Sequence, residues 1–342
     1  MKTVYIMGAG ASSHVGYPLI SGMGKQWLAW MAAYPDGRFQ GSVDLVVERF
    51  GTEPNIEDVI TEIESMIDSL ESSDVLENRL QRALLGSTRG QLSDGLREWF
   101  RKLHLRPATA YAKFADEVIQ PEDVVITFNY DDSLERELRR RGLWDVSQGY
   151  GFPLGRIEQP SPVLVLKLHG SINWLALIFG GAISGPIAVG SNLSIGQHPV
   201  IHKSDLEFLG YTDFSGHVYP GGGAFPSLIL PGRTKEFFYR TSFGEEWRPF
   251  FDRLWSQATE ALKQAGRVVV CGYGMLPVDK QACDMILRDS NKEAKVEIVC
   301  GSRGKRIADD FRNAGFKDVS FDPAGYFEEW VQQRINEASA AR

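Results

Sequence analysis

Residues 163–174 read VLVLKLHGSINW, a mostly apolar run that ends on a histidine, a glycine and small polar residues. The run is bounded by Pro162 and Gly170, and its first part is typical of a strand buried on both faces of a parallel sheet, where apolar and polar positions do not alternate. Ligands in such sheets bind beyond the carboxyl ends of the strands. The sequence therefore predicts that this strand delivers His169 to a cleft. A core histidine satisfied by a backbone carbonyl is the alternative.

Two other apolar runs end in the same way. One starts at the N-terminus and leads into Gly8-Ala9-Gly10-Ala11-Ser12, and the second, 124–128, leads into Asn129-Tyr130-Asp131. A parallel sheet gathers the carboxyl ends of its strands along one edge. We therefore expect both sets of residues to lie near His169.

Composition is that of an ordinary globular protein, with 342 residues, 43% hydrophobic and 24% charged. A chain of this length buries about three quarters of its unfolded surface, so a large core is available. The net charge of -7 disfavours a nucleic-acid footprint over the whole surface. The basic run 136–141 leaves direct nucleic-acid binding open locally, but a solvated helix end is the favoured interpretation.

The cysteines, Cys271, Cys283 and Cys300, are too few and too scattered for a disulfide framework or a four-cysteine zinc site. His198 and His202 flank Pro199, which spoils a helical metal pair. The first residues contain no secretory segment, and glycines and prolines interrupt the uncharged span 168–197. We expect a cytoplasmic protein without zinc and without a membrane helix.

The middle of the first half has helical patterning throughout. Residues 34–120 are expected to form a helical insertion between the first two strands, because Ile56, Val59, Ile60 and Ile63 recur at helical spacing behind Asn55 as a cap. The helices expected around and within it are 22–33, 56–70, 74–85, 93–103 and 107–119.

From residue 227 onward, strands and helices alternate. Regular structure returns at 227–231, strands are expected at 267–271, 296–300 and 319–321, and helices at 245–265, 279–288, 307–314 and 325–335, besides the helix expected at 131–141 after the second strand. Residues 175–226 form a glycine-rich region without a sustained period, expected to be irregular and near the active site. The alternation predicts an α/β fold, a Rossmann-like doubly wound parallel sheet with a helical insertion.

The glycine pair after the first strand is also typical of a phosphate-binding loop. A strand that runs straight into Gly8-Ala9-Gly10 lets the backbone approach a pyrophosphate. The stretch departs from the dehydrogenase fingerprint, because Ser13 replaces the third glycine and no acidic residue follows at a second strand. Residues 22–26 fail as a phosphate loop, since Leu19 and Gln26 replace required positions. Hydride transfer and nucleoside triphosphate binding are both disfavoured.

Three motifs in chain order, GAGAS at 8–12, TFNYD at 127–131 and KLHGS at 167–171, resemble the signature of the sirtuin superfamily. CGYGMLP at 271–277 is similar to the glycine-rich strand end that holds the adenosine half of NAD in that family. The resemblance spans nearly all of 1–342, which we expect to be a single catalytic domain. The match is most detailed with the bacterial sirtuin-like branch of NAD-hydrolysing proteins in antiphage defence.

The resemblance implies a site. Its catalytic residues would be Asn129, His169 and Asp131, with His169 as base, while His14 matches no motif. The NAD-binding residues implied are Gly8, Ala9, Gly10, Ala11, Ser12, Phe128, Gly170, Ser171, Asn173, Gly272, Tyr273 and Gly274. Deacetylase sirtuins usually carry two Cys-x-x-Cys pairs that hold zinc, and this chain has none, which disfavours peptide deacylation.

The implied reaction is cleavage of NAD to nicotinamide and ADP-ribose. Nicotinamide leaves as a neutral molecule, so the enzyme mainly has to stabilise an oxocarbenium-like ribose and place a nucleophile. Asp131 either offsets that positive charge or caps the following helix. The alternatives are a deacylase or ADP-ribosyltransferase, and an inactive module that senses NAD or ADP-ribose. The resemblance also implies a homo-oligomer and a protein partner, for example a HerA-type ATPase.

Overall fold

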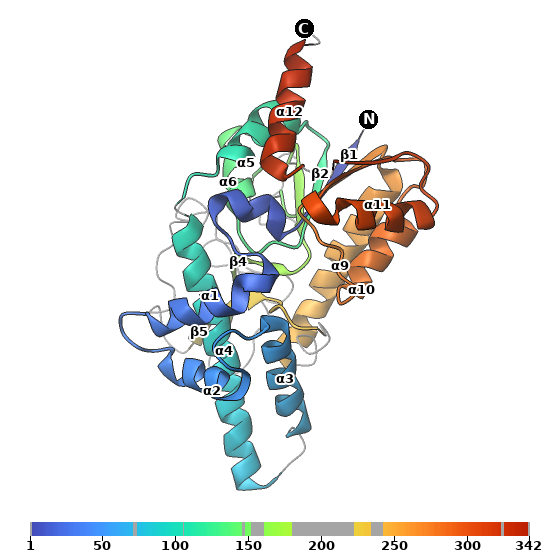
Figure 1. Cartoon of the computed structure of the whole chain (residues 1–342). Coiled ribbons are helices and arrows are strands. Elements are labelled where there is room, and N and C mark those ends of the chain that lie inside the picture. Colours follow the sequence, from blue (N-terminus) through green and yellow to red (C-terminus); the bar gives the residue numbers. More distant parts are fainter. Residues whose placement is uncertain are drawn as a thin grey trace.

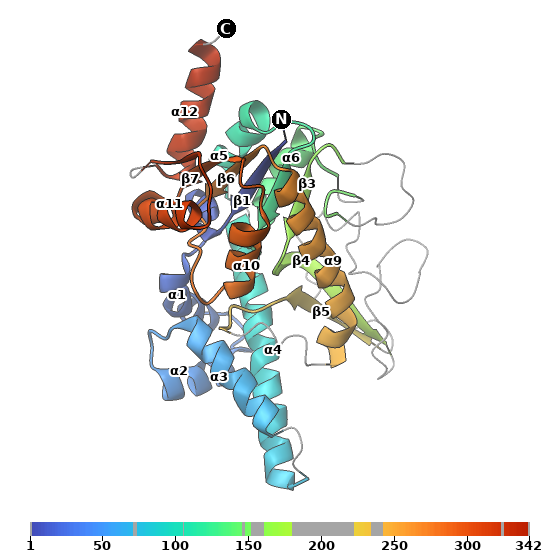
Figure 2. The same cartoon turned by 90° about the vertical axis from the view of Figure 1, so that its right-hand side faces the viewer.

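The computed structural model describes residues 2–70, 74–104, 106–145, 148–151, 161–179, 222–233, 242–322 and 325–340. Within these residues, six parallel strands form one sheet in the order β3-β2-β1-β6-β7-β8 (Figures 1 and 2). Their bounds are β1 (Thr3–Met7), β2 (Val124–Thr127), β3 (Leu164–Lys167), β6 (Arg267–Cys271), β7 (Lys295–Val299) and β8 (Val319–Phe321). The predicted Rossmann-like α/β sheet is confirmed.

The strand order reverses beside β1. The chain builds outward from β1 to β2 and β3 on one side, then crosses to β6, β7 and β8 on the other. In open α/β sheets the crevice for a ligand forms at such a switch point, outside the carboxyl ends of the strands. The topology alone therefore marks the ends of β1 and β6 as the centre of a candidate site.

The register aligns the strand ends in one row. Met7 pairs with Thr127 and Cys271, Thr127 pairs with Lys167, and Cys271 pairs with Val299. Each of these residues is the last of its strand. The loops that follow the five strands therefore start at the same level, and the predicted gathering of the three polar strand ends is confirmed.

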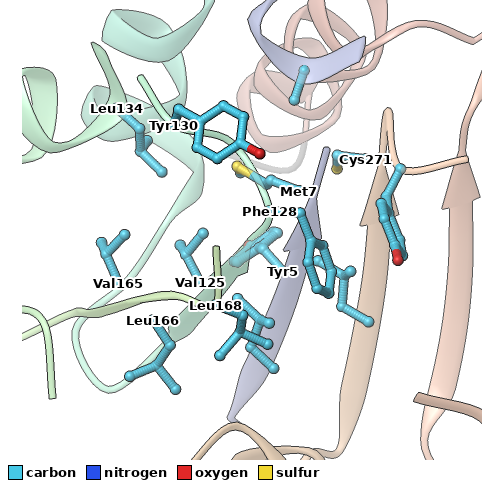
Figure 3. Close-up of a cluster of buried hydrophobic side chains, with 14 of the residues drawn as sticks. Tyr5, Met7, Val125, Phe128, Tyr130, Leu134, Val165, Leu166, Leu168 and Cys271 are labelled. Atoms are coloured by element: carbon cyan, nitrogen blue, oxygen red, sulfur yellow. The ribbon is translucent and has the colours of Figure 1, made fainter. Parts of the chain in front are cut away.

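Apolar strands hold this row in place. β1 and β2 are buried along their whole length, as β-type runs of Val, Ile, Tyr and Thr favour when helices cover both faces. Figure 3 shows Tyr5, Val125, Val165 and Leu166 meeting in this core. Tyr5 also packs edge-on against Phe114 at 4.9 Å between ring centroids.

Helices flank the sheet in two groups. The first contains α5 (Thr109–Lys113), η2 (Phe114–Val118), α6 (Ser133–Arg140) and α12 (Phe327–Ala340), and the second contains α9 (Ser242–Gln264) with η4 (Met285–Asp289). α10 (Lys280–Asp284) precedes η4, and α11 (Gly304–Asn313) packs on β7 and β8. The predicted alternation from residue 242 onward is confirmed.

The predicted helical block lies between β1 and β2. It contains α1 (Ile20–Ala32), α2 (Gln40–Phe50), α3 (Ile56–Ser69) and α4 (Leu76–His104) in addition to α5 and η2. Asn55 caps α3 as predicted, accepting a hydrogen bond from Glu57 N at 3.0 Å. In Figure 1, α3 and the start of α4 extend away from the sheet as a pair.

One helix replaces two that the sequence predicts at 74–85 and 93–103. Gly86 and Gly90 lie in open space on α4, between the two predicted helices, and Gly95 packs against Met31 of α1. Glycine in a helix interior costs only about 0.5–1 kcal/mol relative to alanine. Packing of α4 against α1, α2 and α3 outweighs that cost.

A second, antiparallel sheet follows β3. The chain turns at Gly170, whose φ of 80° favours glycine, and β4 (Gly170–Phe179) pairs with β5 (Gly222–Leu228). The prediction that 175–226 is irregular is therefore wrong at both ends, because cross-strand pairing orders residues that have no clear period. Of the segment 227–231, where regular structure was predicted to return, β5 includes only the first two residues. Residues 180–221, including His198 and His202, lie outside the described residues.

The basic run 136–141 lies on α6 and just beyond its end. Asp116 accepts ion pairs from Arg140 at 2.8 Å and from Arg141 at 3.0 Å. This is consistent with the favoured interpretation as a helix end. In the described part of the chain, no helix is both long and apolar enough to cross a membrane.

Candidate functional site

A cavity of about 390 Å³ opens beyond the carboxyl ends of the strands. Residues from every loop of the aligned row line it, and they include Gly8, Ala9, Gly10, Ser12, Phe128, Asn129, Asp131, His169, Gly272, Tyr273 and Gly274. Ala11, Gly170, Ser171 and Asn173, which the sequence also assigned to the site, are not among the lining residues. The fold thus brings together the ends of β1, β2, β3 and β6.

Asn129 joins the end of β2 to the loop after β1. Its Nδ2 donates to Gly8 O at 2.9 Å and to Ser12 Oγ at 3.0 Å. Gly8 O is only an acceptor, so the amide group has to face it with its nitrogen. Both N–H groups are then used, and the Oδ1 acceptor of Asn129 is the atom left for a ligand or a water molecule.

Ser12 connects Asn129 to Asp131. Its hydroxyl donates to Asp131 Oδ2 at 2.7 Å and lies 2.7 Å from the hydroxyl of Tyr111. A serine hydroxyl has one proton, so Ser12 gives it to the carboxylate and accepts from Asn129 and Tyr111. Burial raises the pKa of Tyr111 well above its usual range, which keeps that hydroxyl a donor. Every donor in this network therefore has an acceptor. The network holds the amide group of Asn129 in place through Ser12.

Both carboxylate oxygens of Asp131 accept hydrogen bonds from other groups of the protein. Oδ2 accepts from Ser12, and Oδ1 accepts from Ser133 N at 3.1 Å, at the first residue of α6. The side chain is 5% exposed and still lines the cavity. This geometry supports the interpretation that Asp131 anchors the start of the helix, and it adds a role in orienting Ser12.

His169 lies at the end of β3 and is 8% exposed. The ring of Phe128 packs edge-on against its ring at 5.2 Å between centroids, and its backbone carbonyl accepts from Ile229 N at 3.0 Å. Phe128 in turn stacks on Tyr273 at 4.2 Å with an interplanar angle of 17°. Figure 3 shows Phe128 next to the ends of β1 and β6. The stacked rings of Phe128 and Tyr273 therefore connect the end of β2 with the end of β6.

Ser171 and Asn173 point into a buried network instead of the cavity. Ser171 Oγ donates to Tyr130 O at 3.3 Å, and Asn173 Nδ2 donates to Tyr150 OH at 3.0 Å. Both side chains are buried, at 0% and 4% exposure. The turn at Gly170 redirects the chain into β4, so residues that follow His169 closely in sequence leave the site.

Beneath the site lies an ion pair that the sequence analysis did not identify. Lys167 Nζ donates to Glu135 Oε1 at 2.8 Å and also to the backbone carbonyl of Asp131, and Tyr150 donates to Glu135 at 3.3 Å. Lys167 and Glu135 are 0% and 1% exposed. Burial raises the pKa of Glu135 while Lys167 opposes that rise. A lone lysine within an apolar strand was the available signal for a buried partner.

The glycines have a structural role that the sequence analysis did not predict. A Cβ on Gly10 would lie 2.7 Å from Gly272 Cα, and a Cβ on Gly8 would lie 2.7 Å from Tyr273 Cα. Gly10 N donates to Gly272 O at 3.0 Å, and Gly272 has a φ of 61°. The loops after β1 and β6 are thus packed backbone to backbone. These glycines also line the cavity, so the expected approach of a pyrophosphate to this backbone stays a prediction.

The far side of the cavity is formed by the turn after β7. Cys300, Ser302 and Arg303 line it, together with Tyr326 just before α12. Burial raises the pKa of the Cys300 thiol to about 11, so the thiol is protonated and weakly nucleophilic. No sequence motif had singled out these residues.

Metal ligands are not grouped in the part of the chain that the structure describes, where no three His, Cys, Asp or Glu side chains could hold an ion. Cys271, Cys283 and Cys300 are free thiols. The absence of zinc from the protein stays a prediction.

No protein-family model matches the sequence, and no curated protein matches it either. Solved structures of Sir2 enzymes are similar at low identity. A chain from a study of the mechanism and regulation of Sir2 enzymes is 14% identical with a TM-score of 0.44, covering 100% of this chain and 94% of that one. A Sir2 homologue in complex with ADP-ribose is 12% identical with a TM-score of 0.43, at coverages of 99% and 92%.

Sir2 bound to an acetylated peptide is 13% identical with a TM-score of 0.38, at coverages of 99% and 93%. At these identities and TM-scores no residue's role transfers to this chain. The chemistry has to follow from the cavity's own residues.

Proposed function

We propose that this protein is a sirtuin-like NAD glycohydrolase that cleaves NAD into nicotinamide and ADP-ribose. The observation that carries the proposal is the joint lining of one cavity by Asn129 and His169, which follow neighbouring strands, and by the glycine loops after β1 and β6. A cavity across the switch point suits an extended dinucleotide. The resemblance of the strand-end motifs to the sirtuin signature supports the choice of NAD.

In the proposed reaction, the bond between the ribose C1′ and the pyridinium nitrogen breaks, and a water oxygen bonds to C1′. Nicotinamide keeps the electron pair of the broken bond and leaves neutral. Asn129 Oδ1, held by the Ser12 network, accepts a hydrogen bond from the attacking water or a ribose hydroxyl. His169 takes the proton, as a neutral imidazole can near neutral pH.

Asp131 is a positioning residue in this proposal. Its carboxylate holds the Ser12 hydroxyl at 2.7 Å, and that hydroxyl accepts one N–H of Asn129. Since both carboxylate oxygens already accept hydrogen bonds, the side chain acts on the ribose through Asn129.

The test is an incubation of the purified full chain with NAD, followed by chromatography of the products. Equal amounts of nicotinamide and ADP-ribose support the proposal. Labelled ADP-ribose transferred to protein, or an acyl group transferred from an acylated peptide, would establish the transferase or deacylase alternative. Tight binding without turnover, unchanged by co-encoded proteins, would identify a sensing module.

A role in antiphage defence and control by a partner belong to the same proposal. A constitutive NADase would exhaust the cofactor of its host, so we propose a homo-oligomer of low activity that an associated protein switches on. α4 carries a row of exposed apolar side chains, Leu76, Leu80 and Leu84, as a surface for the contact between copies. Light scattering on the wild type and Leu80→Glu tests this: a monomeric wild type would refute the oligomer.

A further inference from the structure

The cavity has two chemically different ends. The end beyond β2 and β3 holds Asn129 and His169, where the proposed bond cleavage takes place. A dinucleotide with its nicotinamide ribose there has to place its other nucleoside toward the ends of β6 and β7. That end offers Tyr326, Ser302 and Arg303.

Arg303 sits at the end of the turn Gly301–Arg303, directly after β7 and directly before α11. Its guanidinium reaches back over the β6 loop, because a Cβ on Gly274 would lie 2.7 Å from Arg303 Nη1. The missing side chain of Gly274 leaves room for it there. The cation is therefore held at the border between the β6 and β7 ends, on the wall of the cavity.

No carboxylate of the described residues neutralises Arg303. The nearby cation that does form an ion pair is Arg306. It pairs with Asp310 at 2.9 Å and donates to the carbonyls of Gly274 and Met275. The carboxylates that line the cavity are Glu57, Asp131 and Asp279, and none forms an ion pair with Arg303. The turn after β7 thus presents a guanidinium and the Ser302 hydroxyl, and Asp322, whose carboxylate lies beside Gly325, does not line the cavity.

Tyr326 adds a flat surface beside this cation. Its ring covers the turn, since a Cβ on Gly301 would lie 2.7 Å from Tyr326 Cε1, and the residue is 58% exposed. Large exposed aromatic rings at a cavity wall are suited to stacking on a nucleic-acid base. A purine placed on Tyr326 would have its ribose close to the turn that carries Arg303.

In dinucleotide-binding folds, an acidic residue about 20 residues beyond the glycine-rich turn hydrogen-bonds the ribose 2′-hydroxyl of NAD, whereas an arginine nearby accommodates a 2′-phosphate. Arg303 follows β7, the next strand along the chain after the glycine-rich end of β6. We infer that Arg303, with Ser302, selects a dinucleotide whose adenosine ribose carries a 2′-phosphate, so that NADP is bound in preference to NAD. The inference rests on the proposed function for its choice of nucleotide, and it deepens that function by naming the substrate class.

The test measures binding without turnover. ADP-ribose and 2′-phospho-ADP-ribose are titrated by calorimetry into the wild type, Arg303→Gln and Lys305→Gln. The wild type should bind the 2′-phosphate about ten- to a hundred-fold more tightly, as charge-assisted hydrogen bonds from an arginine provide. Arg303→Gln should bring that ratio near one. Lys305→Gln, an equal loss of charge on α11 outside the cavity lining, should keep it.

Equal affinities in the wild type would overturn the inference, and so would a preference that survives in Arg303→Gln. Arg303 is exposed, so the variant is expected to fold, and its melting temperature checks this. Cleavage assays with NAD and NADP separate the two proposals. NAD cleavage without a 2′-phosphate preference rejects the inference alone, whereas a clear preference without cleavage of either dinucleotide rejects the glycohydrolase alone.

Discussion

The two ends of the cavity are built by different means. At the β2 and β3 end, polar side chains hold one another: the half-buried Asn129 and the buried Ser12 and Asp131 form a directed chain of hydrogen bonds, and Lys167 pairs with Glu135 beneath them. At the β6 and β7 end, the backbone of Gly10 packs directly on Gly272, and the functional candidates Arg303 and Tyr326 are exposed.

The two ends of the cavity are therefore suited to different tasks. The first holds reacting groups in a fixed geometry, and the second binds part of the ligand. Side chains that hydrogen bonds hold in one orientation have one geometry, which the placement of a reacting bond requires. An exposed arginine and an exposed tyrosine can change their side-chain conformation to fit a ligand, but they have no fixed orientation before it binds. Substitutions of the hydrogen-bonded side chains at the first end should therefore affect turnover and stability together, and those of the exposed Arg303 and Tyr326 at the second end should affect affinity.

The largest effect is expected from His169→Ala. Loss of a general base lowers the rate by about 10²–10⁴-fold, so nicotinamide release should fall by that factor while ADP-ribose still binds. Initial rates of nicotinamide release measure it. His14→Gln is the control, because His14 does not line the cavity. A folded His169→Ala variant with wild-type turnover would remove His169 from the mechanism.

Lys167→Met tests how much the buried ion pair between Lys167 and Glu135 stabilises the protein. The substitution leaves Glu135 buried without a counter-ion, which costs about 3–5 kcal/mol of unfolding free energy. Urea unfolding monitored by circular dichroism measures the loss. The double variant Lys167→Met/Glu135→Leu should recover most of it, since the unpaired charge is gone. A single variant as stable as the wild type would show that the pair does not hold the β3 end.

Asp94→Asn should stabilise the protein in a way that depends on pH. Asp94 lies on α4 near Arg97, whose Nε donates to Ile172 O at 3.0 Å in β4. Burial raises the pKa of Asp94 from 3.8 to about 6, while Arg97 and Arg38 oppose the rise. The folded state thus binds this proton more tightly than the unfolded state, and stability falls as pH rises between these values.

Removing the carboxylate should gain up to about 3 kcal/mol above pH 6, from about two pKa units at 1.36 kcal/mol each. The gain should shrink as pH falls below 6 and disappear only well below pH 3.8, where Asp94 is protonated in both states. Unfolding free energies at pH 7.5 and 4.5 provide the comparison. A gain of equal size at both pH values would mean that burial of this carboxylate is not the cause.

Gly10→Ala should affect the loop contact at the second end. The new Cβ would meet Gly272 Cα at 2.7 Å, so we expect a loss of about 1–3 kcal/mol in unfolding free energy. Gly86→Ala is the matched control on α4, where nothing lies near the new Cβ, and it should stabilise by about 0.5–1 kcal/mol. If Gly10→Ala lowers nucleotide affinity and leaves stability unchanged, the original pyrophosphate interpretation of this glycine would be right.

Much of the site follows from local sequence. The ends of β1, β2 and β3 were predictable because apolar β-type runs stop at glycines and small polar residues, and parallel pairing then aligns these ends whatever else the chain does. The placement of Asn129 and His169 in one cavity is a consequence of that alignment. The helix that begins at Asn55 was equally clear, because its cap and its apolar period are both local.

What the local sequence left undecided depends on distant contacts. The positive φ of Gly170 and the pairing of β4 with β5 turn Ser171 and Asn173 away from the cavity, although they adjoin His169 in sequence. Packing against α1, α2 and α3 carries α4 through Gly86 and Gly90 as one helix. Each of these outcomes is set by partners far along the chain, which no local pattern encodes.

By itself, the sequence determined the sheet, its polar strand ends and the candidate residues Asn129 and His169, because strand formation and termination depend on neighbouring side chains. Only the tertiary structure decided that the amide of Asn129 faces Gly8 and Ser12, that Gly10 packs on Gly272, and that Arg303 reaches the cavity. The physical reason is that the directions of hydrogen bonds and the closeness of two backbones are fixed by elements that meet only after the chain has folded.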